Sequence, residues 1–459
     1  MSNSEVERDD EPVTPAGRLF LQPDSYQIIH IIMGCKNPID TDAVKSAITN
    51  SVMIQLPRFS SLLVRNSHGR EHWRKTQVDV DRHVVVVEDP VSDTAAGNEE
   101  AVNDYVADLA VSSPLSSDKP LWEVHLLRAH NCMVFRIHHA LGDGISLMSM
   151  LLEWGRRADE PHQSPSTGSL GTSSLNKNQR RELWKLVVWM FMNVVFIVEF
   201  VLRALWVKDQ RTAVSGGAGV ELWPRKLATA KFRLDDMKQV KKAVAGATIN
   251  DVLSGVVSFG LSRYLDMRSP KALQDGVQIT GLAMVNLRKR PGLQELSDMI
   301  RGDPGIRWGN KFGTLLFPVY YRQGGADPLQ HVKTAKKIMD QKKQSLEAHL
   351  SYYIGISCFA PKVANWFSYR IVCNTTFTIS NVVGLKEEIT IAGNPVTYMR
   401  VNNTSLPHAI TMHMLTYGDR ADMQILVAKD IIPDPQVLAK CFEDALLQMK
   451  EAATKQLGK

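Results

Sequence analysis

The chain has 459 residues, which is more than one ordinary domain holds and predicts two domains. Hydrophobic residues make up 44% of the chain and charged residues 22%, which allows substantial cores and excludes global disorder. The net charge of +6 suits an anionic cofactor or a lipid surface, and no nucleic-acid-binding motif accompanies it. The five cysteines are odd in number and scattered, which argues against a disulfide framework and for a reducing compartment.

The first third of the chain alternates strand and helix patterns. Residues 1–17 begin as an acidic, polar stretch, so a flexible arm is expected there and a secretory signal or transit peptide is not. Residues 18–157 are expected to form a layered α/β domain. The patterns predict strands at 26–33, 61–65, 71–77, 83–87, 122–128 and 132–137, and helices at 40–56, 98–111 and 145–154.

Residues 158–224 are expected to link two domains. The part before residue 180 is rich in Ser, Gly, Pro and Asn, as linkers are. The apolar segment Leu183–Val207 follows, and it is about long enough to cross a bilayer. A helix at ~100° per residue would gather its polar side chains in one arc, namely Lys185, Asn193, Glu199 and Arg203.

This single polar stripe predicts a helix that lies in a membrane interface. The polar side chains would stay in the headgroup layer while the large apolar ones sink. The side chains expected to sink are Trp189, Phe191, Phe196 and Leu202. A single transmembrane span and a buried core helix are the two alternatives.

Residues 225–459 are expected to form a second α/β domain. Predicted strands lie at 228–234, 278–287, 310–321, 375–383, 388–391, 396–401, 409–417 and 423–428. Predicted helices lie at 235–245, 248–265, 328–348, 352–368 and 435–450. No short repeat period is present.

One stretch, Arg136–Leu147 (RIHHALGDGISL), joins a predicted strand to a predicted helix. It places His138 and His139 at a strand end, where a neutral imidazole near pH 7 serves as a general base. Asp143 is close enough to fix the loop through a charged hydrogen bond, and Gly144 permits a close backbone approach. Two adjacent histidines alone would more often be ordinary core residues. A metal site is disfavoured, because no further ligand follows at the spacing of a helical zinc motif.

The compound pattern HHxxxDG is the signature of the CoA-dependent acyltransferases, a superfamily that includes chloramphenicol acetyltransferase. Together with other stretches in order, the chain resembles the plant-type bifunctional wax ester synthases/diacylglycerol acyltransferases. These stretches are LPRF at 56–59, DVDRH at 79–83, PLWE at 120–123, TIND at 248–251, VNLR at 285–288 and SNVVG at 380–384. The chain departs from the family pattern at Met284 and Leu385, where proline is common.

The resemblance implies two chloramphenicol acetyltransferase-like α/β sandwich domains with an interdomain tunnel and the HHxxxDG motif midway. Acyl-CoA, as a substrate rather than a resident cofactor, would enter from one end. A long-chain fatty alcohol or diacylglycerol would enter from the other. His139 would take the proton of the acceptor hydroxyl, Asp143 would orient the loop, and no covalent acyl-enzyme would form.

The remaining site candidates come from the motif-bearing stretches and from clusters of cations. Oxyanion donors are sought in Asn250, Asn286 and Ser380, with helix capping by Asn250 and turn formation by Asn286 as the alternatives. Trp122 is expected either to line the acyl channel or to be a core residue. The candidates for the CoA phosphates are Arg288, Lys289, Arg290, Lys336 and Lys337, although charge runs are usually solvated faces.

The expected function is therefore acyl-CoA-dependent O-acylation of a lipid alcohol at a membrane surface. Attachment to the cytosolic face of the endoplasmic reticulum is expected, with the plasma membrane as the other location. Two other hypotheses stay open: an acyltransferase of the same fold for soluble alcohols or amines, and a catalytically silent, membrane-bound lipid-binding protein.

Overall fold

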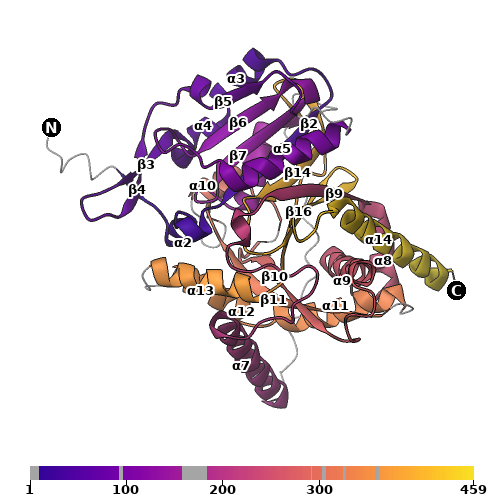
Figure 1. The fold of residues 1–459 in the computed structure, drawn as a ribbon. Coiled ribbons are helices and arrows are strands. Elements are labelled where there is room, and N and C mark those ends of the chain that lie inside the picture. Colours follow the sequence, from indigo (N-terminus) through magenta and orange to yellow (C-terminus); the bar gives the residue numbers. More distant parts are fainter. Residues whose placement is uncertain are drawn as a thin grey trace.

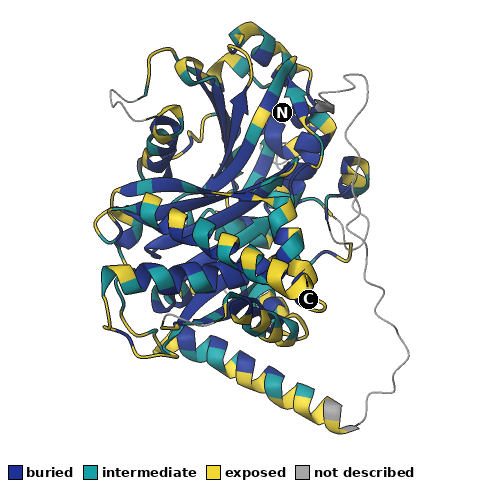
Figure 2. Ribbon diagram, turned by 90° about the vertical axis from the view of Figure 1, so that its right-hand side faces the viewer, coloured by how far each residue is buried: buried dark blue, intermediate teal, exposed yellow. Residues whose placement is uncertain are grey.

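Two mixed β-sheets organise the described part of the chain in this computed structural model (Figure 1). The structure describes residues 10–91, 97–157, 183–290, 292–301, 307–323, 327–356 and 361–458. Helices cover the outer faces of both sheets, and buried residues concentrate in the strands and on the helix faces that meet them (Figure 2). This arrangement confirms the predicted α/β class with two sheet-centred units.

The first sheet has seven strands in the order β5-β6-β7-β2-β14-β13-β8. Its central strand β2 (Ile28–Cys35) is buried along its whole length, as its run of isoleucines predicts. The strands beside it are β5 (Val84–Val87), β6 (Trp122–Leu127), β7 (Cys132–His138), β8 (Arg156–Arg157), β13 (Ile389–Ile391) and β14 (Asn394–Asn403). The helices of this unit are α3 (Thr41–Thr49), α4 (Val52–Gln55), α5 (Asn98–Ser112) and α6 (Gly144–Trp154).

Two strands of the first sheet come from the second half of the chain. β14 pairs antiparallel with β2, so that Val401 lies opposite Ile31 and Asn403 opposite Ile29. The prediction that residues 225–459 form one self-contained domain is therefore wrong for 389–403. This crossing carries the backbone of Val401 and Asn403 to the wall of the central cavity.

The N-terminal residues are more structured than predicted. Residues 1–9 lie outside the described part, but β1 (Glu11–Pro12) pairs with β4 (Glu71–Lys75), which also pairs with β3 (Ser61–Arg65). Helix α2 (Pro15–Leu19) begins at Thr14, whose hydroxyl accepts a hydrogen bond from the Gly17 amide at 3.2 Å. The expectation of a flexible arm is thus wrong for 10–17, and the next residue after α2, Phe20, reaches the candidate site.

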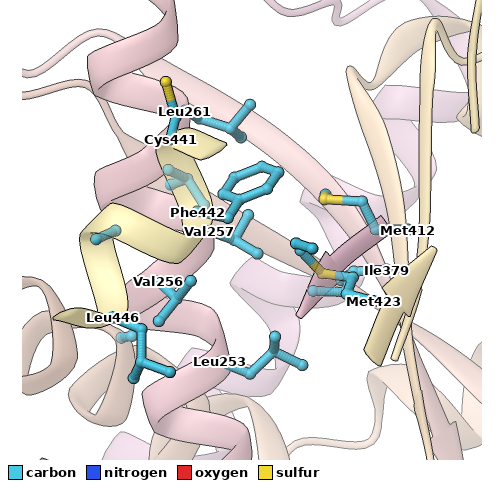
Figure 3. Close-up of a cluster of buried hydrophobic side chains, with 14 of the residues drawn as sticks. Leu253, Val256, Val257, Leu261, Ile379, Met412, Met423, Cys441, Phe442 and Leu446 are labelled. Atoms are coloured by element: carbon cyan, nitrogen blue, oxygen red, sulfur yellow. The ribbon is translucent and has the colours of Figure 1, made fainter. Parts of the chain in front are cut away.

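The second sheet has six strands in the order β11-β10-β12-β15-β16-β9. They are β9 (Arg225–Arg233), β10 (Gln278–Asn286), β11 (Phe312–Tyr320), β12 (Phe377–Val382), β15 (Ile410–Tyr417) and β16 (Arg420–Ala428). Helices α8 (Leu234–Ala243), α9 (Ile249–Arg268) and α14 (Pro435–Leu457) pack on one face (Figure 3). Helices α9 and α14 touch closely: a Cβ at Gly260 would lie 2.3 Å from Phe442, so only glycine fits there.

Two predicted helices are divided in the structure. The residues predicted as helix at 40–56 form α3 and α4, and those at 328–368 form α11 (Pro328–Lys343), α12 (Glu347–Ile356) and α13 (Pro361–Asn374). Ser345 causes the turn between α11 and α12, because its hydroxyl donates to the Lys342 carbonyl at 2.7 Å and accepts from the Glu347 amide at 3.3 Å.

Helix α7 (Leu183–Leu205) projects from the body, where it packs against α12 and α13 (Figures 1 and 2). Its segment Leu186–Leu205 is long and apolar enough to cross a membrane, by length and composition only. The helix is inverted relative to a helix on the surface of a soluble protein: its outward side chains are apolar. Val187, Phe191 and Val194 are 63%, 64% and 58% exposed.

The polar side chains of α7 face the protein instead. Arg203 is buried and donates to Asp209 at 2.6 Å, and the amide oxygen of Asn193 accepts from the Leu346 backbone at 2.7 Å. Glu199 lies 3.7 Å from Lys342. The expectation that these side chains stay in a headgroup layer is therefore wrong; the side chain of Lys185 lies outside the described part.

Of the large apolar side chains, Phe191 is exposed as predicted, but Phe196 is buried beneath the Lys342 ammonium, 4.1 Å from its ring centroid. Trp189 donates from Nε1 to the Gln344 carbonyl at 2.9 Å. The polar arc of α7 is thus its docking face on the protein, and the outward apolar arc lies on the other side of the helix.

Candidate active site

The junction between β7 and α6 carries the HHxxxDG motif. Asp143 is the N-cap of α6: its Oδ1 accepts a hydrogen bond from the Ser146 amide at 3.0 Å. A Cβ at Gly144 would meet the side chain of Val382 at 3.2 Å, so this position favours glycine. The sequence therefore places the last histidine of the motif and the first turn of a helix at one end of the first sheet.

The second carboxylate oxygen of Asp143 connects the two halves of the chain. Oδ2 accepts from Nη1 of Arg288 at 2.7 Å and from the Lys311 amide at 3.0 Å. The Arg288 side chain is 0% exposed. The role predicted for Arg288 in binding CoA phosphates is therefore wrong, because this buried guanidinium is already paired with a buried carboxylate. Asp143 occupies the loop-orienting position that the sequence predicted.

Residues 308–311, the clamp segment, hold the motif loop from the second half of the chain. Trp308 donates from Nε1 to the Leu141 carbonyl at 2.7 Å. The Gly309 carbonyl accepts from the Ser146 hydroxyl at 3.1 Å and from Arg288 at 2.6 Å. Gly309 has a φ of +118°, which a residue with a side chain rarely adopts.

Asn310 of the clamp segment fixes the imidazole of His139. The Asn310 amide nitrogen donates to the His139 carbonyl at 2.8 Å, which turns Oδ1 toward Nδ1 of the same histidine, 2.9 Å away. Since Oδ1 is only an acceptor, Nδ1 must carry the proton and donate it. Nε2 then holds a lone pair, as a general base requires. The ring also stacks on Phe20, with centroids 4.1 Å apart.

Burial keeps both motif histidines neutral. It lowers the pKa of His139 below its usual value, although the nearby Asp143 carboxylate opposes the shift. Burial lowers the pKa of His138 to about 3. Nδ1 of His138 accepts from the Ala140 amide at 3.1 Å, and its ring meets the edge of Tyr26 at 4.6 Å. His138 therefore supports the loop, and His139 is the histidine that lines the cavity.

The cavity beside His139 has a volume of about 300 Å³ and a mostly apolar wall. Its apolar lining comes from α2, α7, α12, α13 and β10, for example Leu19, Phe200, Tyr352, Ile371 and Leu282. Polar groups gather at the His139 end. They are His139, Asn286, Asn310, Ser380 and His413. Among the described residues, no three His, Cys, Asp or Glu side chains are arranged to hold a metal ion.

The three predicted oxyanion donors separate in the structure. Asn286 and Ser380 line the cavity. Asn286 also forms the predicted turn, because its Oδ1 accepts from the Arg288 amide at 3.1 Å. Asn250 is not among the cavity-lining residues; it is exposed and accepts from Asn381 at 2.6 Å. Asn250 is not the cap of α9 either, because Thr248 caps that helix in a capping box with Asp251.

Trp122 belongs to the core rather than to the channel. It is fully buried, donates from Nε1 to the Phe59 carbonyl at 2.8 Å and stacks on His83 at 3.8 Å. The channel role predicted for Trp122 is therefore wrong.

The remaining cations predicted to meet CoA lie at the surface, away from the cavity lining. Lys289 and Arg290 are exposed next to Arg288. Lys336 pairs with Asp340 at 2.5 Å along α11, and Lys337 is exposed on the same helix. Their role toward CoA stays a prediction.

Two cavity residues, Asn310 and His413, were missed at the level of sequence. Asn310 stands in a short polar segment whose partner lies 171 positions away, and no local pattern reports that contact. His413 left a weak signal. It alternates with Met412 and Met414 along β15, which are fully buried in the core of the second unit, so a polar residue on the opposite face was a candidate for the interdomain side.

Replacing Asn310 by aspartate changes the pH dependence in a predictable direction. An added carboxylate beside Nδ1 stabilises the imidazolium and raises the pKa of His139. The base works only when it is neutral, so activity is lost below that pKa, and the acidic limb of kcat/KM should move to higher pH. Asn310→Ala should lower kcat by about 10-fold or more, because it removes the group that fixes the tautomer. An acidic limb that stays in place in Asn310→Asp would contradict the contact's role.

Comparison with known proteins agrees with this geometry. The model of the wax ester synthase/diacylglycerol acyltransferase catalytic domain matches residues 34–253, and the WS/DGAT C-terminal domain matches 308–450. Wax ester synthase/diacylglycerol acyltransferase 5 of Arabidopsis thaliana is 34% identical, covering 97% of this chain and 94% of its own length. Number 11 of the same series is 33% identical, covering 97% and 95%.

Solved structures show the same fold at low sequence identity. The wax ester synthase/diacylglycerol acyltransferase from Marinobacter aquaeolei gives a TM-score of 0.59 at 17% identity, covering 96% of this chain and 100% of that one. Trichothecene 15-O-acetyltransferase from Fusarium sporotrichioides gives 0.60 at 11% identity, covering 96% and 95%. A rhizomide synthetase condensation domain, in complex with C8-CoA, gives 0.56 at 12% identity, covering 98% and 96%. From its domains and its curated relatives, the chain belongs to the wax ester synthase/diacylglycerol acyltransferase family and is an acyltransferase.

Proposed function

We propose that the protein transfers the acyl group of a long-chain acyl-CoA to a long-chain fatty alcohol, which gives a wax ester. Diacylglycerol, which gives triacylglycerol, is the second acceptor. The observation that carries the proposal is a histidine held as a neutral base, with Nδ1 bonded to Asn310, at the polar end of a mostly apolar cavity. The names of the relatives supply both product classes.

The chemistry follows from where the proton can go. Nε2 of His139 takes the proton of the acceptor hydroxyl, and the oxygen attacks the thioester carbonyl. The tetrahedral intermediate expels the CoA thiolate, which receives the same proton from the imidazolium. No acyl-enzyme is needed, because holding both substrates in one cavity already removes much of the entropic barrier.

The wall of the cavity favours a lipid over a soluble acceptor. Most of its lining is aliphatic or aromatic, so a soluble phenol or amine would lose its hydration without finding matching polar partners. A catalytically silent binding protein would not need the tautomer of His139 to be fixed.

The proposed substrates are tested by turnover with labelled palmitoyl-CoA and, in parallel, hexadecanol, dioleoylglycerol and a soluble short-chain alcohol. Hexadecyl palmitate should be the main product, followed by triacylglycerol. Preferred turnover of the soluble alcohol would contradict the proposal.

We propose further that α7 attaches the protein to one leaflet of a membrane, on the cytosolic face of the endoplasmic reticulum. The exposed side of α7 is apolar, and its polar arc is occupied by the protein, so the free face suits a lipid layer. Helices α12 and α13, which pack against α7, also line the cavity, which would bring a lipid acceptor close to its destination.

A single crossing by α7 is incompatible with the contacts of the active site. His139 precedes α7 and Asn310 follows it, yet they bond at 2.9 Å. Both flanks of α7 must therefore share one side of the bilayer. Tags at the two termini should give the same accessibility to protease in sealed microsomes. Tags on opposite sides would contradict monotopic attachment.

A further inference from the structure

A second histidine, His413, lines the same cavity as His139, and the chemistry above gives it no task. It lies on β15 and is 5% exposed. Its neighbour in the parallel register of β12 is Ser380, which also lines the cavity. The fold thus brings a buried imidazole to the polar end of the cavity, close enough to His139 for the two rings to interact electrostatically.

His413 has no hydrogen-bond partner among the described residues. Its Nδ1 is shielded from solvent and unpaired. Buried polar side chains in folded proteins nearly always have a partner, and an exception calls for an explanation. The other buried histidine of the same strand region, His408, illustrates the rule, because both its ring nitrogens bond to threonine hydroxyls at 2.8 Å.

The location of the single proton on His413 follows from burial. Burial lowers the pKa of His413 to about 4, and His139 adds to the shift, so the ring is neutral near pH 7 and carries one N–H. An orphaned buried N–H is rarer than an under-satisfied acceptor. The shielded Nδ1 therefore holds the lone pair, and the proton is on Nε2. Nε2 is then also the one ring nitrogen that a cavity ligand can reach.

The two histidines of the cavity are thus opposite tautomers. His139 has its proton on Nδ1, bonded to Asn310, and offers a lone pair. His413 offers an N–H and has no protein acceptor for it within the described part of the chain. A neutral imidazole of this kind can polarise a carbonyl without giving up its proton.

We propose that His413 is the oxyanion donor: its Nε2–H donates a hydrogen bond to the thioester carbonyl oxygen as that oxygen becomes negative. This inference rests on the acyl transfer proposed above. The bond from the acceptor oxygen to the carbonyl carbon forms, the carbonyl π pair moves onto the oxygen, and His413 stabilises that charge. When the C–S bond breaks, the charge leaves with the thiolate, and His139 returns the acceptor's proton to it. His413 keeps its proton throughout.

The position of the donor gives a test that a merely structural role would not pass. His413→Met keeps an apolar side chain of similar length and removes the N–H; kcat should fall by about 10²–10³-fold with little change in KM. His413→Gln carries an amide N–H near the position of Nε2 and should recover much of the loss. His413→Asn, whose amide is placed nearer the position of Nδ1, should recover little.

Thr411→Val is the matched control. Thr411 lies two residues away on the same face of β15, its hydroxyl is buried without a partner, and it does not line the cavity. Its turnover should stay near that of the wild type. The thermal midpoints of all variants are measured, and if His413→Met does not fold, the comparison of Gln with Asn decides.

Three results would overturn the inference: near wild-type kcat in His413→Met, equal loss in folded Gln and Met variants, or equal activity in Gln and Asn variants. Failure of the proposed function looks different, because the wild-type protein itself would then form no ester from any of the acceptors.

Discussion

The His139→Ala variant is expected to bind acyl-CoA and to form almost no ester. Positioned proton transfer contributes about 10²–10⁴ in rate, and in this cavity only Nε2 of His139 is both unprotonated and held by a fixed partner on the far side of its ring. The loss should appear in kcat, measured with radiolabelled acyl-CoA and long-chain alcohol. Near wild-type turnover would show that another group takes the proton.

His138→Ala separates the base from its neighbour. His138 points to the other side of the strand, accepts from the Ala140 amide and packs against Tyr26, and it does not line the cavity. We expect a smaller loss of activity than in His139→Ala, together with a lower thermal midpoint. Equal and complete losses in both variants, with both proteins folded, would mean that the loop rather than the base is limiting.

Asp143→Ala is expected to have the largest effect on stability. It leaves the Arg288 guanidinium, 0% exposed, without its carboxylate at 2.7 Å, and unpairing such a buried charge costs about 3–5 kcal/mol. It also removes the acceptors of the Ser146 and Lys311 amides, so the motif loop loses its position and activity falls with stability. Chemical denaturation and turnover measure the two effects.

Asp143→Asn should cost less in both measurements, because an amide oxygen can still cap α6. The double variant Asp143→Asn/Arg288→Gln removes the unpaired charge and should be more stable than Asp143→Ala. Unchanged stability in Asp143→Ala would contradict the ion pair. Complete and equal loss of activity in Asp143→Asn and Asp143→Ala, both fully stable, would instead assign a chemical role to the negative charge.

The parts of the fold that the sequence predicted are those with local causes. The run of isoleucines in β2 and the polar cap at the start of α9 each predict an element from neighbouring residues alone. The crossing of β14 into the first sheet has no such cause. Residues 396–401 read as a strand in either domain, and only tertiary pairing with β2 decides between them.

The candidate site divides in the same way. The base is recognisable because HHxxxDG is a compact motif at a strand end. Arg288 was taken for a surface cation because it begins a run of three basic residues, and burial against Asp143 depends on a contact 145 positions away. The same holds for α7, where periodicity located the polar arc correctly but not its surroundings. A polar stripe on an apolar helix fits a headgroup layer or a protein surface equally well, and here it faces Lys342 and Asp209.

The most direct test of the central claim, base-catalysed transfer without an acyl-enzyme, is one reaction of the purified wild-type protein with labelled palmitoyl-CoA. In the presence of hexadecanol, we expect equimolar hexadecyl palmitate and free CoA, and in its absence neither product. Intact-mass spectrometry of the protein in both mixtures should show no added palmitoyl group. A palmitoylated protein that forms with palmitoyl-CoA alone and transfers its acyl group when hexadecanol is added would contradict the mechanism, and the absence of ester under all conditions would contradict the proposed function.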